Sequence, residues 1–304
     1  MANEIRFFHR PHKKIEVEKV YGDAFIRFLY CSAPGQALIP LLNNKFLSNF
    51  YGELQNKPAS RKKVPSFIKQ FSLQMDDYLP GSIEDKPIEE SYAHFNEFFI
   101  RKLKPEARPF VTEPERMAAF AEARYVGFEA MNDKEVYPVK GKYLRAKDLL
   151  AHEQLSKVFE GGPLLIARLC PVDYHRYHYP DHGKVLDHFP IHGKYDSVNP
   201  LALKAKGEIM IQNERHVSIL QTENFGKLAY IEVGAMCVGK IVQTHDVKNS
   251  FLRGEEKGYF LFGGSTVIVL GEKGAWKPSL DILENTKRKM ETYLKLGTEV
   301  AVKA

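Results

Sequence analysis

Apolar residues recur at helical spacing in the first hundred residues of the chain. Across residues 17–29 the apolar positions are three or four residues apart, which is typical of an amphipathic helix. Pro34-Gly35 is expected to end this helix, and a second apolar run follows over residues 37–50. The patterns over residues 66–78 and 91–102 predict two more helices. The N-terminal third is therefore predicted to be a helical layer.

The pattern changes beyond Pro105. Short apolar runs now alternate with Gly, Pro, Asn and Asp, which indicates antiparallel strands closed into a sandwich or barrel. A final helix is expected over residues 281–296. The sequence thus predicts an α+β protein, with a helical region over residues 1–104 packed on a β-rich body over 105–304. The runs expected to form strands are 164–169, 183–189, 209–212, 217–221, 227–234, 238–243 and 267–270.

Basic residues are concentrated at the N-terminus. The net charge is +6, yet residues 1–70 hold 12 Lys/Arg against 5 Asp/Glu, and aromatic residues are interspersed among them. Such a segment can rest on an anionic membrane surface or bind nucleic acid. An ordinary solvated helical face is the third interpretation. Nucleic acid is the least supported, because no recognised binding module accompanies the charge.

The three cysteines are far apart and fit no metal-ligand spacing. Cys31, Cys170 and Cys237 are therefore expected to be small buried hydrophobic residues in a reducing compartment. Charged residues interrupt any signal-peptide core near Met1, and no run approaches the roughly 18 apolar residues that span a bilayer. These features predict a cytoplasmic protein without a membrane span.

A glycine pair interrupts the apolar run over residues 258–270. Gly263 and Gly264 lie inside what otherwise reads as a buried strand, and Ser265 follows them. Paired glycines in a strand favour a bend or a close backbone approach. The Ser265 hydroxyl could then attack the carbonyl before it and convert the Gly264–Ser265 amide into an ester. An ordinary bulge with a solvated serine is the alternative.

Five of the eleven histidines fall between residues 175 and 192. His175, His178 and His182 could bind a metal, but Pro171, Pro180 and Gly183 make the required helix improbable, so no metal is expected. Tyrosines alternate with these imidazoles in a half-buried pattern, which disfavours a plain surface loop. A histidine near a serine nucleophile is the usual acceptor of the hydroxyl proton.

Several segments in this order resemble the phosphatidylserine decarboxylase family, in its branch with Gly-Gly-Ser-Thr. The resemblance covers residues 10–297. The matching segments are Phe98-Phe99-Ile100-Arg101-Lys102-Leu103, Ala107-Arg108-Pro109, Asp173-Tyr174-His175-Arg176-Tyr177-His178, Gly193-Lys194-Tyr195-Asp196-Ser197-Val198-Asn199-Pro200, Asn213-Glu214-Arg215, Val233-Gly234-Ala235, Gly263-Gly264-Ser265-Thr266 and Leu283-Glu284-Asn285-Thr286.

The resemblance implies a proenzyme that cuts itself between Gly264 and Ser265. Ser265 would become an N-terminal pyruvoyl group, the covalently built cofactor, and the two products would stay together as a heterodimer, with further dimerisation left open. The pyruvoyl group would form a Schiff base with phosphatidylserine and release CO2 and phosphatidylethanolamine, a step of phospholipid biosynthesis. The protein would act as a peripheral enzyme on the cytoplasmic face of the cell membrane.

The family performs the cut with an Asp-His-Ser arrangement. The serine corresponds to Ser265 and the histidine to His178, while His175 matches the histidine assigned near protonation of the carbanion. The acid differs, because Glu122 stands in Phe120-Ala121-Glu122-Ala123-Arg124 where the family usually has Pro-Ala-Asp-Gly. Its extra methylene moves the carboxylate by about 1.5 Å.

Two other functions compete with this one. A serine hydrolase could use Glu122, His178 and Ser265 on external esters, although Ser265 is not in a Gly-x-Ser-x-Gly elbow. A non-enzymatic membrane-surface protein could use the basic N-terminus alone. Intact mass separates them, since only the self-cleaving enzyme yields two chains.

Overall fold

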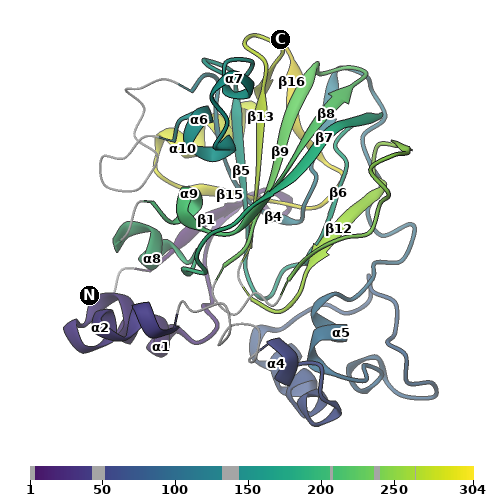
Figure 1. Cartoon of the computed structure of the whole chain (residues 1–304). Helices are drawn as coiled ribbons and strands as arrows, with labels where there is room; N and C mark the ends of the chain where they lie inside the picture. Colours follow the sequence, from purple (N-terminus) through teal and green to yellow (C-terminus); the bar gives the residue numbers. More distant parts are fainter. Residues whose placement is uncertain (1–3, 43–51, 132–143, 206–207, 236–239, 264) are drawn as a thin grey trace.

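A ten-stranded sheet forms the centre of the molecule (Figure 1). The computed structural model describes residues 4–42, 52–131, 144–205, 208–235, 240–263 and 265–304. Neighbouring strands of the sheet are antiparallel, except that β1 and β15 are parallel. Their order is β11 (Ser250–Phe251), β7 (Gly183–Ile191), β8 (Arg215–Thr222), β9 (Lys227–Val233), β13 (Ser265–Gly271), β5 (Leu164–Leu169), β4 (Ala123–Phe128), β15 (Glu291–Leu294), β1 (Arg6–His9) and β2 (Lys14–Val17).

Two three-stranded sheets complete the β-structure. One has the order β10 (Ile241–Gln243), β12 (Glu256–Phe260) and β6 (Arg176–His178), and the other has β14 (Trp276–Pro278), β16 (Glu299–Lys303) and β3 (Arg116–Ala118). The described strands do not close into a barrel. The predicted α+β class is confirmed, and the barrel alternative is not.

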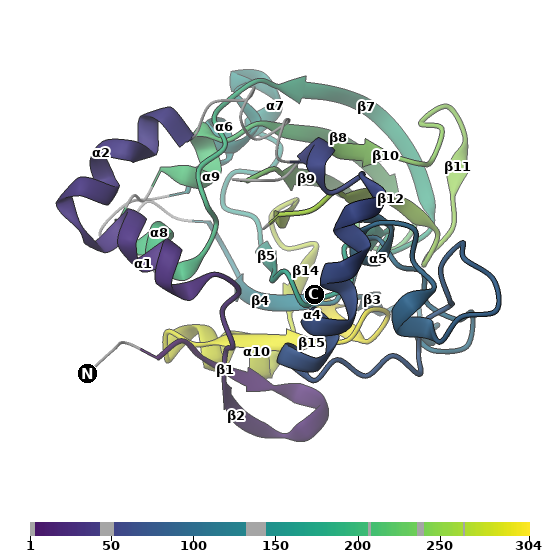
Figure 2. The same ribbon diagram turned by 90° about the horizontal axis from the view of Figure 1, so that it is seen from below.

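The helices surround the sheets in separate groups. In Figures 1 and 2, α1 and α2 lie at one side of the lower end of the large sheet, and α4 and α5 lie at the other. The helices are α1 (Asp23–Cys31), α2 (Ala33–Leu42), α4 (Lys63–Phe71), α5 (Phe95–Phe99), α6 (Ala146–Leu150), α7 (Glu153–Ser156), α8 (Pro200–Ala205), α9 (Ile209–Gln212) and α10 (Leu280–Lys287), with 3-10 turns η1 (Arg10–His12), η2 (Pro58–Lys62) and η3 (Ile88–Glu90). The predicted N-terminal helical layer is not confirmed, because the chain begins with the β1–β2 hairpin, which extends the large sheet.

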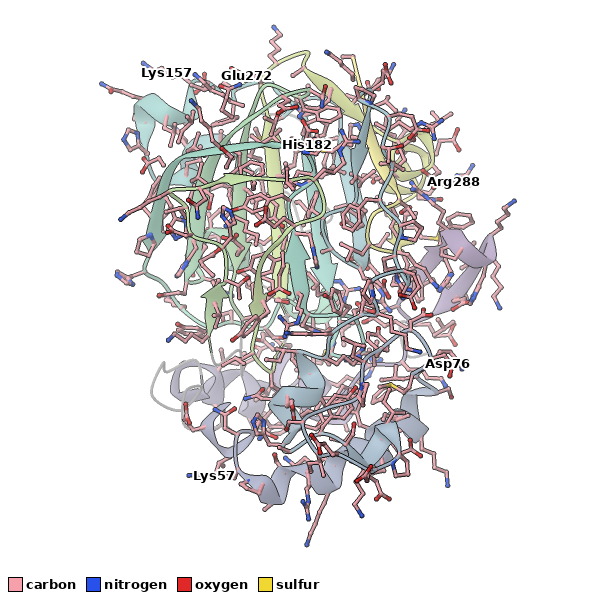
Figure 3. The ribbon with its side chains drawn as sticks, turned by 90° about the vertical axis from the view of Figure 1, so that its right-hand side faces the viewer. Lys57, Asp76, Lys157, His182, Glu272 and Arg288 are labelled. Atoms are coloured by element: carbon pink, nitrogen blue, oxygen red, sulfur yellow. The ribbon has the colours of Figure 1, made fainter. Side chains whose placement is uncertain are left out.

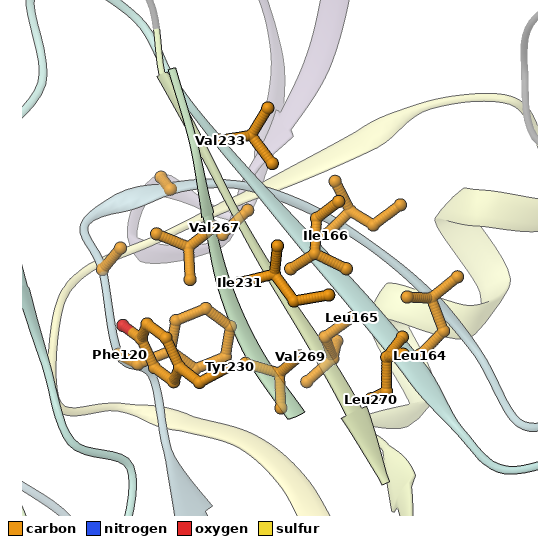
Figure 4. Close-up of a cluster of buried hydrophobic side chains, with 14 of the residues drawn as sticks. Phe120, Leu164, Leu165, Ile166, Tyr230, Ile231, Val233, Val267, Val269 and Leu270 are labelled. Atoms are coloured by element: carbon orange, nitrogen blue, oxygen red, sulfur yellow. The ribbon is translucent and has the colours of Figure 1, made fainter. Parts of the chain in front are cut away.

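The main core is built around β5, β9 and β13 (Figure 4). Every residue of β5 and β13 is buried, so apolar residues are consecutive along most of each strand instead of alternating with polar ones. Residues such as Ile166, Ile231 and Val267 are almost completely buried, and each contributes about 1.5–3 kcal/mol of hydrophobic stabilisation. Ser265, the first residue of β13, is therefore attached to one of the most firmly packed elements of the molecule.

Several predicted elements differ in type or extent. The helix expected over residues 66–78 is α4, which ends at Phe71, and the helix expected over 91–102 is the shorter α5. Residues 209–212 were expected to be a strand but form α9, because a run of three apolar residues followed by Gln212 is too short to reveal its period. The helix expected over residues 281–296 ends at Lys287. Lys289 has a left-handed backbone with φ 58°, and the chain then continues as β15.

The N-terminal helix boundary and one cysteine also differ from expectation. Ser32, with extended φ −121° and ψ 146°, separates α1 from α2, whereas Pro34 and Gly35 lie in the first turn of α2. Proline is tolerated there because the first backbone N–H groups of a helix have no internal partner. Cys170 is buried as expected, Cys31 is exposed, and Cys237 lies outside the described residues.

Candidate active site

Ser265 lies at the head of the central strand β13. Its backbone is opposite Leu169 of β5, and the next residue, Thr266, is paired with Val233 of β9. The Ser265 side chain is fully buried, and its Oγ has no hydrogen-bond partner among the described residues. Gly264, the other residue of the predicted cleavage point, lies outside those residues. An unpaired buried hydroxyl at a predicted nucleophile is consistent with a reactive role.

The segment before the cleavage point is held by contacts from three directions. The backbone N–H of Phe260 donates to the His175 carbonyl (3.0 Å), and that of Leu261 donates to the Lys240 carbonyl (3.1 Å). The backbone N–H of Phe262 donates to Asn96 Oδ1 (2.9 Å). Gly263 then has φ +148°, a conformation that side-chain-bearing residues rarely adopt. The sequence-based expectation of a special backbone at the glycine pair is thus confirmed for Gly263.

His175 lies directly before β6 and is completely buried. Its Nδ1 is 3.0 Å from the carbonyl oxygen of Asp173, and its ring packs on Phe99 with centroids 3.8 Å apart. A carbonyl can only accept, so Nδ1 carries the proton and Nε2 has the lone pair. Nε2 makes no hydrogen bond within the described residues. Burial lowers the pKa of His175 to about 3, although the backbones of Asp173 and Gly263 act to raise it.

His178, the last residue of β6, is also buried and has the same tautomer. Its Nδ1 donates to the Gly254 carbonyl (2.9 Å), and its Nε2 accepts from the Tyr174 hydroxyl (3.3 Å). Burial lowers the pKa of His178. A neutral imidazole with its lone pair on Nε2 can accept a proton, which is the role predicted for this residue.

Glu122 lies just before β4 and is bound by an arginine rather than by a histidine. Arg108 donates to both of its carboxylate oxygens, from Nε (2.6 Å) and Nη2 (3.1 Å), and the Tyr293 hydroxyl donates to Oε1 (3.0 Å). Glu122 and His178 share no hydrogen bond in the described structure. The three predicted members Glu122, His178 and Ser265 are all buried, but the structure does not join them into a hydrogen-bonded relay.

The sequence reasoning missed the buried arginines near the site. Arg101 donates to the carbonyls of Val172 (2.9 Å) and Asp173 (3.2 Å), and Arg124 Nη1 donates to Asp173 Oδ2 (2.6 Å). The sequence analysis included Arg101 and Arg124 only as parts of the segments 98–103 and 120–124, without a role of their own. Alternating apolar patterns give no sign of which basic residue turns inward, so only the three-dimensional contacts reveal this role.

The histidine-rich segment forms no metal cluster within the described residues. The donor atoms that do lie within 4.8 Å of one another belong to His9, His12 and Glu16, at the β1–β2 hairpin. His9 Nδ1 accepts from the His12 backbone N–H (3.2 Å), so its Nε2 carries the proton. That protonation state does not suit a metal ligand.

Comparisons with known proteins agree with the resemblance found in the sequence. The family model described as phosphatidylserine decarboxylase matches residues 95–300. A phosphatidylserine decarboxylase proenzyme of Clostridium perfringens (strain SM101) is 38% identical over 98% of this chain and 100% of the relative. The proenzyme of Fusobacterium nucleatum is 38% identical over 97% and 96%, and that of Clostridium botulinum (strain Hall) is 36% identical over 98% and 99%. The chain therefore belongs to the phosphatidylserine decarboxylase family, a family of carboxy-lyases.

Proposed function

We propose that this chain is a self-processing decarboxylase that converts phosphatidylserine to phosphatidylethanolamine with a pyruvoyl group made from Ser265. The observation that carries the proposal is the unpaired, buried Oγ of Ser265 at the head of β13, after a glycine in a conformation that other residues rarely adopt. The relatives named as proenzymes support self-processing. The substrate follows from the same names.

The residues can perform the cut without an outside nucleophile. Ser265 Oγ attacks the carbonyl carbon of Gly264, and His178 Nε2 takes the hydroxyl proton in exchange for its contact with Tyr174. The amide C–N bond then breaks, the freed amine takes the proton back from His178, and an ester remains. Elimination removes the Cα proton of Ser265, breaks its Cβ–Oγ bond and forms a Cα=Cβ bond, which releases the carboxylate of Gly264. Water adds at the former Cα and ammonia leaves, which produces the pyruvoyl group.

The surroundings of Ser265 fit such a group. The residue is fully buried at the end of an apolar strand, so its hydroxyl is shielded from bulk water before the cut. The pyruvoyl ketone, once formed, supplies an electron sink for loss of CO2 from the substrate amine adduct. His175 has an Nε2 without a hydrogen-bond partner among the described residues, and we assign to this residue the proton transfer to the substrate carbon after CO2 leaves.

Self-cleavage is tested by the intact mass of the purified protein. Two chains are expected, residues 1–264 and residues 265–304, and the second should resist Edman sequencing because its N-terminus has no amine. Ser265→Ala should give one uncut chain without decarboxylase activity. An uncut Ser265→Ala protein with full decarboxylase activity would contradict the mechanism. A wild-type protein that stays as one uncut chain and hydrolyses esters would favour the serine hydrolase.

We also propose that the enzyme works as a peripheral protein on the cytoplasmic face of the membrane. No helix in the described residues is long and apolar enough to cross a bilayer. The α1 residues Phe25 and Phe28 are 51% and 43% exposed, and the basic residues Arg61 and Lys62 are exposed in η2. Aromatic side chains suit insertion, and each basic residue adds about 1 kcal/mol near an anionic surface.

Vesicle sedimentation tests this docking surface. Arg61→Glu/Lys62→Glu should bind phosphatidylserine vesicles more weakly, and wild-type binding should weaken but persist as salt rises. The matched control is Lys157→Glu/Lys273→Glu. Figure 3 shows Lys157 at the opposite end of the molecule from Lys57, which precedes η2. Equal losses in both double variants would refute a docking surface at the η2 end.

A further inference from the structure

Five charged residues form a cluster beside the large sheet. They come from four separate parts of the chain and are buried or, in the case of Glu291, mostly covered. They lie on or next to β2, β4, β5 and β15, which Figure 2 shows between the centre and the lower edge of the view. We call this set the Glu18 cluster, and its members are Glu18, Arg124, Arg168, Asp173 and Glu291.

Glu18 neutralises a repulsive pair at the centre of this cluster. Arg124 of β4 and Arg168 of β5 are directly opposite each other in the sheet, an arrangement that is unfavourable for like charges. Glu18 Oε2 lies 3.0 Å from Arg124 Nε and 2.6 Å from Arg168 Nη2. Burial alone would raise the pKa of Glu18, but Arg168 and Arg124 lower it to about 2. The bridging carboxylate is therefore ionised at neutral pH.

The cluster continues into the loop that carries His175. Asp173 Oδ2 accepts from Arg124 Nη1 (2.6 Å) and from the backbone N–H of Cys170 (2.7 Å). The backbone N–H of Asp173 donates back to the Cys170 carbonyl (2.8 Å). Asp173 is thus fixed at both its side chain and its backbone. Its carbonyl is the group that receives Nδ1–H of His175.

We propose that Glu18 is a positioning residue for His175, acting through Arg124 and Asp173. The proposal rests on the proposed function only in giving His175 its role in turnover. Glu18 holds Arg124 against the like charge of Arg168, Arg124 holds the Asp173 carboxylate, and the Asp173 carbonyl keeps the proton of His175 on Nδ1. Nε2 therefore keeps its lone pair, in a ring whose pKa also responds to the backbone of Gly263, two residues before Ser265. Such control of a histidine tautomer by a carbonyl is a known device.

The test replaces the carboxylate of Glu18 by an amide of the same shape. Glu18→Gln should lower kcat by about tenfold to a hundredfold, the size of effect that small misplacements at an active site produce, with little change in KM. Self-cleavage should persist, because within the described part of the chain no side-chain hydrogen bond or ion pair joins Ser265 or His178 to the cluster. The matched control is Glu291→Gln, which removes the same charge from Arg168 (2.8 Å from its Nε) but leaves the Arg124–Asp173 link.

A second readout does not depend on activity. In a Ser265→Ala background, ¹⁵N-labelled histidine side chains report which ring nitrogen of His175 carries the proton, with assignment from the signals lost in His175→Gln. Glu18→Gln should shift the His175 signals toward a mixture of tautomers, and Glu291→Gln should not. This measurement stands even if the protein proves not to cut itself, so it separates failure of the positioning from failure of the proposed function.

Three results would overturn the positioning role. The first is that Glu18→Gln changes neither the His175 signals nor kcat. The second is that Glu291→Gln lowers kcat as much as Glu18→Gln does. The third is that Glu18→Asp abolishes turnover although its His175 signals match those of the wild type. If Glu18→Gln does not fold, Glu18→Asp supplies the same measurements, because the shorter carboxylate keeps its charge but cannot reach both arginines. It should show intermediate kcat and intermediate His175 signals.

Discussion

Lys257 and Glu232 form an ion pair inside the protein. Replacing either partner alone should lower the free energy of unfolding by several kcal/mol, by an amount that depends on pH. Lys257 Nζ of β12 lies 2.5 Å from Glu232 Oε1 of β9 and 2.8 Å from Gln243 Oε1. The side chains of Lys257 and Glu232 are 1% and 0% exposed. Lys257 is the extra residue of a β-bulge between Glu256 and Gly258. Removing one partner of a buried pair leaves the other charge uncompensated.

The cost can be worked out from the proton that the remaining partner must gain or lose. In Lys257→Met, Glu232 avoids a buried charge by protonation, which costs about 3.7 kcal/mol at pH 7 because its ordinary pKa is about 4.3. In Glu232→Gln, Lys257 must lose its proton, which costs about 4.6 kcal/mol from an ordinary pKa of about 10.4. Burial already lowers the pKa of Lys257, with Glu232 opposing that shift. The double variant Lys257→Met/Glu232→Leu should be within about 1 kcal/mol of the wild type.

The two single variants should respond to pH in opposite ways. The native state of Lys257→Met binds one proton more than its unfolded state. Its loss of unfolding free energy relative to the wild type therefore grows by about 1.4 kcal/mol per pH unit as the pH rises. Glu232→Gln has the reverse imbalance, and its deficit shrinks as pH rises. Urea unfolding of the uncut Ser265→Ala protein, followed through the single buried Trp276, measures both at pH 6, 7 and 8. A loss of unfolding free energy below about 1 kcal/mol in either variant would refute this reasoning, as would the same dependence of that loss on pH in both variants.

Three further predictions concern the site. His178→Ala should stay uncut because Ser265 loses its base, whereas His175→Ala should cut but lose most turnover; equal block of cutting on a denaturing gel would contradict this division. Glu122→Gln should slow cutting, since it breaks the two-point contact with Arg108, and Glu122→Asp should retain part of the rate; normal cutting in Glu122→Ala would show that the carboxylate is dispensable. The third prediction is that the free energy of unfolding falls as the pH drops below about 6.5. The pKa of His175 is about 3 and that of His178 is also lowered, so as the pH falls these two histidines take up protons in the unfolded state before they do so in the native state. Each ring should lower the free energy of unfolding by up to about 1.4 kcal/mol per pH unit. Urea midpoints of the Ser265→Ala protein that stay level from pH 6.5 to 5 would oppose this.

Local sequence patterns predicted the elements whose burial is visible in short runs. The strands around Ile166 and Val267 are buried on both faces, so their apolar runs are unambiguous. The N-terminal hairpin was missed because β1 pairs in parallel with β15, almost 300 residues away, and no local period reports such a partner. The final helix was extended too far because the left-handed backbone at Lys289 has no glycine to signal it.

The candidate site shows the same division. Ser265, His175 and His178 could be proposed as site residues because they occur in short contiguous motifs. Their surroundings could not be identified in this way: Glu18 meets Arg168 across 150 residues, and the arginine that binds Glu122 comes from a separate loop. Contacts of that kind depend on the order of strands in the sheet, which a single sequence does not reveal.

The central position of β13 has a consequence for the proposed maturation. A cut before Ser265 would place β13, β14, β15 and β16 in the smaller product. In the large sheet, β13 and β15 each have strands of the larger product on both sides. Neither product alone could satisfy the backbone groups of those strand edges. In the proposed mechanism folding must therefore precede cutting, and the mature enzyme would be one folding unit made of two covalent pieces. Once unfolded, the pieces would have to find each other again, so the working lifetime of such an enzyme would be set by its unfolding rate rather than by an equilibrium.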